Sequence, residues 1–295
     1  MKKWLCILLS LGLMTMPATG CKTESGETPF SNRIIEKKDG LKILAIGNSF
    51  TYNGTQYLMQ ILEALGYTNT RVCRLTIGGL SLEQHKVYFV TDTKYDFDEK
   101  LPGAPGWERS SRSAAEVLAS EDWDIVTLQQ QSGKSGVAET YNEDLDELTE
   151  MIRTFCNNPD VQIGWLMTWA YDKNSDNADF PLFDNDQNKM YESICNAVQT
   201  GILTRNAFDN VIPAGTAVQN ARQKLGDIFC ADGYHLNDFG AYICGLTWIK
   251  AITGCSFENF SYLPDSLRTQ PDALSLSVSA AEAACENLFE ITESA

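Results

Sequence analysis

The sequence predicts an α/β protein whose mostly parallel sheet is covered by helices on both faces. Short apolar runs rich in β-branched residues alternate along the chain with segments whose apolar residues recur at helical spacing. Strands that alternate with helices are joined by right-handed crossovers, which makes the strands parallel. The 295 residues, 43% of them hydrophobic, can bury a large core, and most of the chain is predicted to be one domain.

The first strand and its following helix show this pattern most clearly. Leu41 to Ile46 is a short apolar run that stops at Gly47, and Thr55 to Leu65 follows with helical spacing. The other predicted strands are Arg71 to Ile77, Trp123 to Leu128, Val161 to Thr168 and Val211 to Pro213. The other predicted helices are Ala114 to Leu118, Leu145 to Phe155, Asn188 to Leu203 and Ala241 to Ile252. These runs predict a five-stranded sheet.

One connection is longer than the others. The segment from Lys86 to Arg112 is rich in aromatic and acidic residues, among them Tyr95, Phe97 and Trp107. Connections of this length are often lids or binding loops, and a surface insertion without a role is an equal alternative.

Polar or glycine-rich segments follow four of the predicted strands. They contain Ser49, Gly79, Gln129 and Trp169, each just beyond a strand end. Ligands of open α/β sheets bind beyond the carboxyl ends of the strands. The four segments are therefore expected to meet in one crevice.

The first residues have the composition of a targeting segment. Lys2 and Lys3 precede an apolar stretch from Leu5 to Met16, and small residues follow up to Gly20. This pattern is typical of a secretory signal peptide, here residues 1–20. We therefore expect the mature protein to lie outside the cytoplasm.

Cys21 follows the predicted cleavage site directly. The arrangement resembles a bacterial lipoprotein signal, in which that cysteine is acylated and anchors the protein to a membrane. An ordinary signal peptide with an incidental cysteine is the alternative. Residues 21–40 are polar and are expected to form a tether, followed by the folded domain over 41–295.

The chain has nine cysteines, and setting aside Cys6 and Cys21 leaves seven. They are widely spaced without a C-x-x-C pair, which argues against zinc and iron–sulfur sites. Up to three disulfides are possible, although a buried free thiol is favoured in apolar stretches such as the one around Cys244. The net charge of −16 argues against nucleic acid and against anionic lipid surfaces as partners.

Two motifs point to nucleophilic catalysis. Ser49 follows the first strand, and Asp232 and His235 lie three positions apart near the other end of the chain. A serine hydroxyl is a weak nucleophile until an imidazole takes its proton and a carboxylate orients that imidazole. The chain has only two histidines, so a histidine base must be His235 or His85. His85 is expected to be a surface or structural residue.

These motifs, in this order, resemble the SGNH hydrolase superfamily of GDSL-like esterases, whose fold is a three-layer α/β/α sandwich related to flavodoxin. The resemblance spans residues 41–252, and the chain looks like an exported bacterial branch known mainly as a domain of unknown function. Gly47 to Phe50 matches the first family block, with Asn48 in place of the usual aspartate. The resemblance implies Ser49 as nucleophile, His235 as base and Asp232 as the group that orients it.

The resemblance also implies an oxyanion hole. Its donors would be the N–H of Ser49, the N–H of Gly79 (or of Gly78) and a side-chain amide. The family's third block normally carries Gly-x-Asn-Asp, and this chain has a run of three glutamines there instead. Counting along the block favours Gln131, whereas Gln129 lies closest to the strand end, and both stay open.

Aromatic residues after the fourth strand are candidates for substrate contact. Trp169 and Tyr171 could stack on a sugar ring, with core packing as the alternative, and Asn48 is a further possible substrate contact. The expected function is therefore a serine esterase that removes acyl groups, acetyl above all, from extracytoplasmic glycans. The resemblance implies no cofactor and no metal.

Two rival functions belong to other classes. A catalytically degenerate SGNH fold could bind carbohydrate at the cell surface, and the altered third block would be its sign. A glycoside hydrolase needs two carboxylates that flank one bond, and no spacing in this chain singles out such a pair. A classical α/β-hydrolase is disfavoured because no Gly-x-Ser-x-Gly elbow is present.

Overall fold

A seven-stranded sheet forms the middle layer of residues 30–292, the part of the chain that the structure describes. In this computed structural model the strand order is β4-β3-β2-β1-β5-β6-β7. The parallel strands are β1 (Lys42–Gly47), β2 (Arg71–Thr76), β5 (Ile125–Leu128), β6 (Gln162–Leu166) and β7 (Asn210–Ile212). The antiparallel strands are β3 (Lys94–Lys100) and β4 (Glu108–Ser113).

The parallel strands have the order of a flavodoxin-like sheet. The first strand, β1, lies between β2 and β5, and β6 and β7 continue on the side of β5. The strand order reverses between β1 and β5, which is where such sheets open a crevice at their carboxyl edge. The predicted α/β/α fold class is confirmed, and the segments after β1 and β5 meet at this point.

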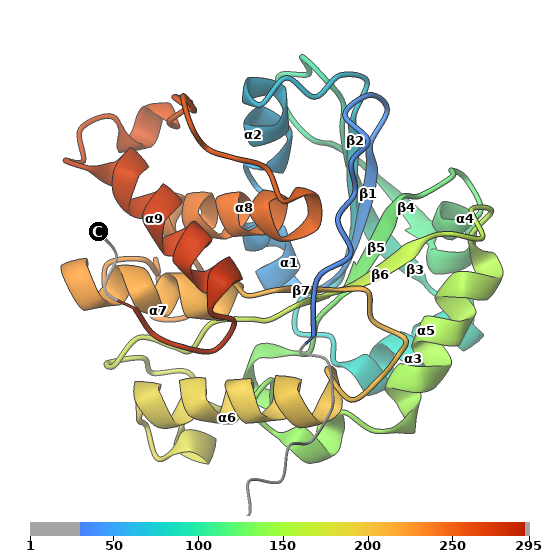
Figure 1. The fold of residues 1–295 in the computed structure, drawn as a ribbon. Coiled ribbons are helices and arrows are strands. Elements are labelled where there is room, and N and C mark those ends of the chain that lie inside the picture. The colour runs from blue at the N-terminus through green and yellow to red at the C-terminus, as the bar shows by residue number, and fades with distance from the viewer. Residues whose placement is uncertain (1–29, 293–295) are drawn as a thin grey trace, which may run out of the picture. The chain divides into compact units, whose positions relative to one another are not determined.

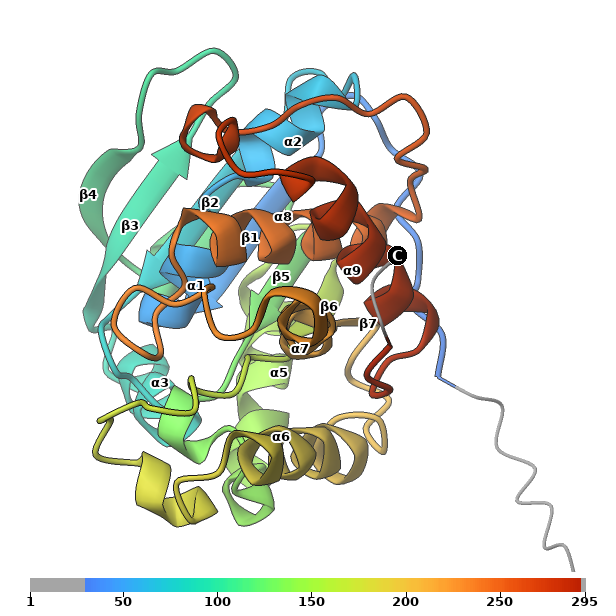
Figure 2. The same cartoon turned by 90° about the vertical axis from the view of Figure 1, so that its left-hand side faces the viewer.

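The sheet has two strands more than the sequence predicted. The segment from Lys86 to Arg112, expected to be a long connection, holds the end of one helix and the β3–β4 hairpin, which lies at the sheet edge (Figure 2). β4 is polar and mostly exposed, so it lacks the apolar alternation that marks a strand. In β3 only Tyr95 and Phe97 supply that alternation.

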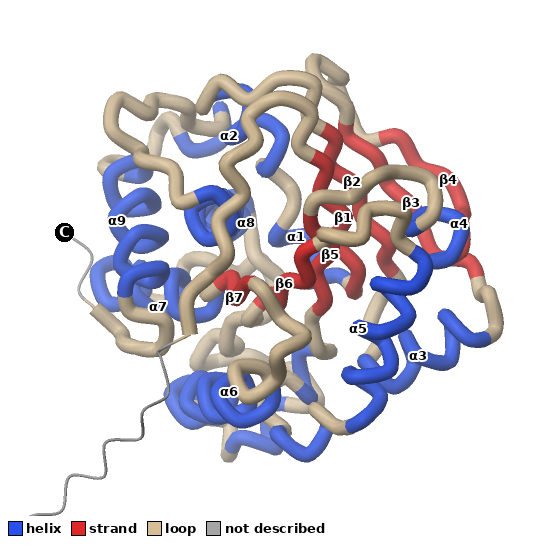
Figure 3. The backbone as a smooth tube through the Cα atoms, turned by 45° about the vertical axis from the view of Figure 1, so that its right-hand side comes forward, coloured by secondary structure: helices blue, strands red, loops and turns tan. Residues whose placement is uncertain are grey.

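Helices cover both faces of the sheet (Figures 1 and 3). On one side are α1 (Ser49–Gly54), α2 (Leu58–Ala64), α7 (Ala214–Leu225), α8 (Asp238–Thr253) and α9 (Ala273–Glu286). On the other are α3 (Leu82–Val90), α4 (Ala114–Leu118) and α5 (Glu143–Phe155), while α6 (Gln187–Gly201) packs beside the turn that precedes α5. The sequence did not predict α1, α3, α7 or α9; the buried residues of α7 and α9 are mostly alanine or polar, which gives a weak apolar period.

Part of the predicted tether is packed on the domain. The Asn32 side chain donates to Val211 O and Ala251 O at 3.0 and 3.1 Å. Ile35 is buried, and its N–H donates to Ile252 O at 2.8 Å. Residues 31–40 therefore belong to the domain, and the prediction of a free tether is wrong for them because Asn32 and Ile35 find partners that the local sequence does not show. The predicted signal peptide and Cys21 lie outside the described residues.

The cysteines carry no disulfide within residues 30–292. All seven are free there, and Cys244 is fully buried, as expected from its apolar neighbours. Burial raises the pKa of the Cys244 thiol, which keeps it protonated. Among the same residues, no helix is both long enough and apolar enough to span a membrane.

His85 is a buried structural residue. It lies on α3 with none of its surface exposed, and its Nδ1 is 3.0 Å from the hydroxyl of Tyr95 on β3. The imidazole also stacks on the Tyr95 ring, with the ring planes 7° apart. Burial lowers the pKa of His85 to about 3, so the ring is neutral at physiological pH.

The buried neutral His85 should make stability depend on pH. Between a pKa of about 6.5 in the unfolded chain and about 3 in the folded protein, only the unfolded chain binds this proton. The free energy of unfolding should therefore fall as the pH falls below about 6.5, by up to ~1.4 kcal/mol per pH unit. His85→Gln should lack this contribution when urea unfolding is compared at pH 7.5 and pH 5.5. His235→Gln, which keeps His85, should retain it. Equal slopes in the wild type and His85→Gln would contradict the buried neutral ring.

Candidate active site

Ser49 begins α1 immediately after β1. The chain leaves the sheet at Gly47, where an added Cβ would lie 2.7 Å from the Gln129 side chain and would also collide with Thr51 Oγ1. Asn48 then takes an extended conformation and caps α1, accepting from Phe50 N–H at 3.0 Å. The Ser49 N–H has no acceptor within the helix because it lies in the first turn. The turn thus presents the Ser49 hydroxyl and N–H at the carboxyl edge of the sheet.

Asn48 joins three strand ends through its side chain. Its Nδ2 donates to Leu80 O beyond β2 at 3.0 Å, and its Oδ1 accepts from Gln129 Nε2 beyond β5 at 2.7 Å. Gln129 Oε1 in turn accepts from Thr51 Oγ1 at 2.7 Å. Asn48 and Gln129 are buried, with 1% and 0% exposed. We call Asn48, Thr51 and Gln129 the polar cluster.

His235 lies between Ser49 and Asp232. Its Nε2 is 2.8 Å from Ser49 Oγ, and its Nδ1 is 2.8 Å from Asp232 Oδ2. With Nδ1 protonated toward the carboxylate, Nε2 is free to accept from the Ser49 hydroxyl. The structure therefore brings together the three residues that the sequence singled out for catalysis.

The Asp232 carboxylate is fixed by its own loop. Oδ1 accepts from the N–H groups of Tyr234 and His235 at 3.2 and 2.8 Å, which leaves Oδ2 for the imidazole. Partial burial raises the pKa of Asp232, but the hydrogen bonds from the His235 ring and from these N–H groups outweigh it and lower that pKa. The carboxylate stays ionised at neutral pH and can hold the Nδ1 proton.

Trp169 connects the serine turn (residues 47–50) to the histidine loop (residues 232–235). Its indole stacks on the Phe50 ring, with centroids 4.4 Å apart and planes 9° apart, and its Nε1 donates to Tyr234 O at 2.8 Å. A second bond, from Asp172 N–H to Gly233 O at 2.8 Å, ties the same post-β6 segment to the loop. The separation between Ser49 and His235 is therefore set by a rigid, fully buried ring.

Three residues predicted to contact substrate do not reach the surface. Asn48, Trp169 and Tyr171 expose 1%, 0% and 0% of their area. The Tyr171 hydroxyl lies 2.9 Å from Ser132 Oγ, and burial raises the pKa of Tyr171 to about 12. The prediction of substrate contact is wrong for all three, and core packing, the alternative for the two aromatic residues, is correct.

Of the two glutamines predicted as oxyanion donors, Gln129 has no free amide proton, whereas Gln131 uses one of its two. Gln129 Nε2 donates to Asn48 Oδ1 and to Gln130 O at 2.7 and 3.2 Å, which uses both of its protons. Gln131 Oε1 caps the short helix η1 (Ser132–Lys134), and its Nε2 donates to Asp179 at 3.1 Å. Gln129 is therefore excluded as an oxyanion donor, and Gln131 forms no hydrogen bond with Asn48, Ser49 or His235 within residues 30–292.

The backbone N–H of Gly79, an exposed residue, is available to donate to an oxyanion. Gly79 has a φ of +71° and open space where a Cβ would lie. Its N–H forms no hydrogen bond within the described part of the chain. Its neighbour Leu80 is bonded to Asn48, the residue before Ser49, so the Gly79 turn is held beside the serine turn.

Sequence reasoning missed some supporting residues of the site. Gln130 is buried, and its Oε1 accepts from Leu82 N–H at 3.1 Å while its Nε2 donates to Thr140 Oγ1 at 3.0 Å. Thr51 supplies the hydroxyl of the polar cluster. The signal for Thr51 was its place two positions after Ser49, but only the fold shows which partner it takes.

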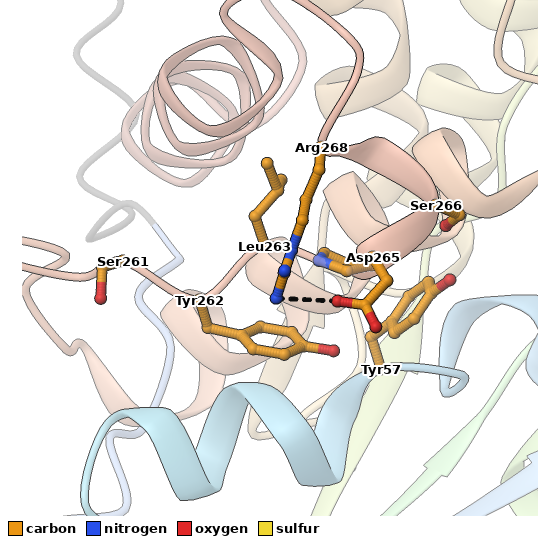
Figure 4. A pocket seen from close by; sticks show the side chains of 8 residues that line it. Tyr57, Ser261, Tyr262, Leu263, Asp265, Ser266 and Arg268 are labelled. Carbon is orange, nitrogen blue, oxygen red and sulfur yellow. Dashed lines mark ion pairs between the residues drawn. The ribbon is translucent and has the colours of Figure 1, made fainter.

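Two surface cavities are lined by residues of the histidine loop or by Tyr57 between α1 and α2. One of about 310 Å³ is lined by Asp172, Asn174, Asp176, Asp227, Asp232 and Gly233. Another of about 640 Å³ lies between Tyr57 and the segment 261–268, where Asp265 pairs with Arg268 (Figure 4). Neither is lined by Ser49 or His235. No cluster of potential metal ligands was found in the described part of the chain.

The family assignment comes from the match of residues 42–284 to "Domain of unknown function (DUF4886)". The chain belongs to the DUF4886 family. A DUF4886 family protein from Bacteroides uniformis ATCC 8492 has a similar crystal structure, with 32% sequence identity and a TM-score of 0.80 over 86% of this chain and 97% of that one. The fold is therefore that of a DUF4886 domain.

Other solved structures are more distant from this DUF4886 chain. Axe2, an acetylxylan esterase from Geobacillus stearothermophilus, has 13% identity and a TM-score of 0.48 over 73% of this chain and 95% of that one. LAE5, an α/β hydrolase enzyme from the metagenome of Lake Arreo, Spain, has 14% identity and a TM-score of 0.46 over 75% of this chain and 98% of that one. No curated protein matches the sequence.

The contacts of the polar cluster predict that an aspartate at position 48 would destabilise the protein. Asn48→Asp would place a carboxylate oxygen against Leu80 O in a buried site, so urea unfolding should show a loss of about 1–3 kcal/mol at pH 7. A protonated carboxyl could donate to Leu80 O, and the deficit should shrink as the pH is lowered. Asn196→Asp makes the same change on the exposed face of α6 and should stay within ~0.5 kcal/mol of wild type. An equally mild effect at position 48 would show that the Leu80 contact is unimportant.

Proposed function

We propose that this protein is a serine ester hydrolase of the SGNH type. The observation that carries the proposal is the chain of two 2.8 Å contacts, from Ser49 Oγ to His235 Nε2 and from His235 Nδ1 to Asp232 Oδ2. A serine with an oriented imidazole base is the arrangement that acyl transfer requires. The resemblance of the Ser49 and Asp232 to His235 segments to the SGNH family supports the same reaction class.

In the acylation step, Ser49 Oγ attacks the carbonyl carbon of the ester as His235 Nε2 takes the hydroxyl proton. The resulting imidazolium is stabilised by the Asp232 carboxylate. His235 then gives the proton to the departing alkoxide oxygen, and an alcohol leaves. The product is an acyl group bound to Ser49 Oγ through a new ester bond.

Deacylation follows the same route with water as nucleophile. His235 takes a proton from water, the hydroxide attacks the acyl carbon, and the proton returns to Ser49 Oγ as the acyl bond breaks. A carboxylic acid is released and ionises at neutral pH. No group outside the chain has to supply or accept electrons.

The oxyanion is assigned to two backbone donors, Ser49 N–H and Gly79 N–H. The proposal gives the glutamines supporting roles, because Gln129 holds the polar cluster and Gln131 caps η1. Backbone N–H groups on rigid turns are preorganised for developing charge, and removal of one such donor typically costs about 10²–10³ in kcat.

The proposed substrates are acyl esters, acetyl above all, on glycans outside the cytoplasm. The support comes from the sequence, since residues 1–20 are typical of an export signal and Cys21 of a lipid anchor. An exported protein meets cell-surface and environmental glycans, whose hydroxyl groups are often acylated.

The proposal predicts that hydrolysis depends on Ser49, His235 and Asp232. In a pH-stat assay on ethyl acetate, Ser49→Ala and His235→Ala should each lower kcat by ~10³-fold or more. Asp232→Asn should lower it by at least ~10²-fold, because the imidazole loses its orienting charge. Ser193→Ala and His85→Gln remove a serine and the other histidine from outside the site, and they should keep kcat within about twofold.

Two outcomes would contradict the proposal. A wild-type protein that hydrolyses neither ethyl acetate nor acetylated glycans would not be an ester hydrolase, and glycan binding without catalysis would then be the better reading. Hydrolysis that survives Ser49→Ala would place the chemistry elsewhere in the molecule.

A further inference from the structure

We propose that Tyr52 is the platform on which a sugar ring of the substrate stacks, beside the Ser49 nucleophile. This inference rests on the proposed function and gives it a substrate subsite. It replaces the buried Trp169 and Tyr171 with an aromatic residue that reaches solvent. Tyr52 exposes 42% of its surface, whereas Trp169 and Tyr171 expose none.

The position of Tyr52 follows from the geometry of α1. Ser49 and Tyr52 are three residues apart on this helix, and side chains at that spacing lie on the same face with Cβ atoms about 5–6 Å apart. The other two aromatic neighbours of the serine turn, Phe50 and Trp169, are packed against each other in the core. A ring bound on Tyr52 would therefore lie within reach of an ester at Ser49.

The Tyr52 ring is held in place from beneath. The Arg74 guanidinium lies 3.6 Å from the centroid of the ring, in a cation–π contact, and Arg74 Nη1 also donates to Tyr52 O at 3.1 Å. Arg74 is 1% exposed, so it lies on the protein side of the ring, while Tyr52 keeps 42% of its surface exposed. An aromatic side chain that is already ordered loses little entropy when a ligand stacks on it.

A row of charges across the sheet holds Arg74 itself. Arg74 on β2, Asp98 on β3 and Arg109 on β4 are direct partners in the strand register, so their side chains share one face. Arg74 Nε donates to Asp98 Oδ2 at 2.9 Å, and Arg109 Nε donates to Asp98 Oδ1 at 2.6 Å. The Trp107 ring centroid lies 3.9 Å from the same guanidinium. The β3–β4 hairpin is thus the support of the Tyr52 platform.

The chemistry of this surface suits a pyranose. Such a ring has a face of C–H groups that carry a partial positive charge, which the negative face of an aromatic ring attracts. Its hydroxyl rim needs donors and acceptors at the edge of the platform. Arg109 and Asp96, with side chains 52% and 57% exposed, provide both at the outer end of the charge row. Paired charges of both signs favour a neutral polyol over a strongly charged ligand.

The test separates sugar recognition from ester chemistry. The full chain and its Tyr52→Ala variant are assayed by pH-stat on ethyl acetate, which has no ring, and on O-acetylated xylohexaose and mannohexaose. Tyr52→Ala should lower kcat/KM for the acetylated hexasaccharides about tenfold, mainly through KM, and change kcat/KM for ethyl acetate less than twofold. Tyr52→Phe should restore glycan activity to within about twofold, because it keeps the ring.

A matched control and a binding arm complete the design. Ile34→Ala removes an apolar side chain of the same exposure, 43%, from the segment that precedes β1, at the opposite edge of the sheet, and should change neither activity. Binding of unacetylated xylohexaose and mannohexaose to Ser49→Ala and to Ser49→Ala with Tyr52→Ala is measured by calorimetry. The second substitution should weaken binding about tenfold. Circular dichroism and urea midpoints establish that each variant is folded.

Each remaining outcome overturns one of the two proposals. An equal loss on ethyl acetate and on glycans would show that Tyr52 acts only through the shape of α1, and no loss on either would show that it does not touch substrate. A wild type without esterase activity would overturn the proposed function, while the calorimetry would still decide the subsite. Binding that is absent, or unaffected by Tyr52→Ala, would overturn the subsite.

Discussion

The site depends on the full set of hydrogen bonds made by the Asn48 side chain. Its one carbonyl oxygen accepts from Phe50 N–H and Gln129 Nε2, and its amide donates to Leu80 O. These bonds tie the ends of β1, β2 and β5 to one buried atom group. A buried amide left unpaired costs about 1–3 kcal/mol, so the three strand ends cannot separate cheaply. The hydrogen bonds of this side chain therefore fix the position of the Ser49 turn relative to the Gly79 turn.

Trp169 extends the same rigidity to the fourth strand end. Its ring packs on Phe50, and its N–H holds Tyr234 O, so that one side chain spaces the nucleophile turn from the histidine loop. The aromatic character that suggested sugar stacking serves packing here, and the indole N–H provides the directional contact. A buried tryptophan needs a partner for that N–H. The partner in this fold is the backbone beside His235, which couples core packing to the geometry of the site.

The sequence predicted the parallel strands and the three residues of the serine, histidine and aspartate chain because those signals are local. Ser49 follows an apolar run, and Asp232 and His235 lie on one loop whose spacing alone lets them meet. The sequence did not predict the β3–β4 hairpin because β4 is polar and exposed. Gln129 was misassigned because the partner of an amide depends on which loops approach it, and the local sequence does not record this. Residues 31–40 were misassigned for the same reason, since their partners are about 180 to 220 positions away.

Where the SGNH block that this sequence resembles carries an asparagine, this chain has glutamines, and Gln129 is part of the buried scaffold of the site. Gln129 is long enough to reach back across Gly47 to Asn48, and in doing so it spends both amide protons on the scaffold. Under the proposed function, charge on a reacting oxygen is met by the backbone N–H groups of Ser49 and Gly79, which cannot rotate away. Because Asn48, Trp169 and Tyr171 are also buried, the proposals assign substrate recognition to side chains that reach solvent. Tyr52 is the aromatic one on the face of α1 that carries Ser49, and the hairpin that supports it is the addition to the five-stranded parallel sheet. Under the two proposals, buried side-chain amides position the reacting groups, whereas the exposed Tyr52 ring, supported by Arg74, binds the substrate.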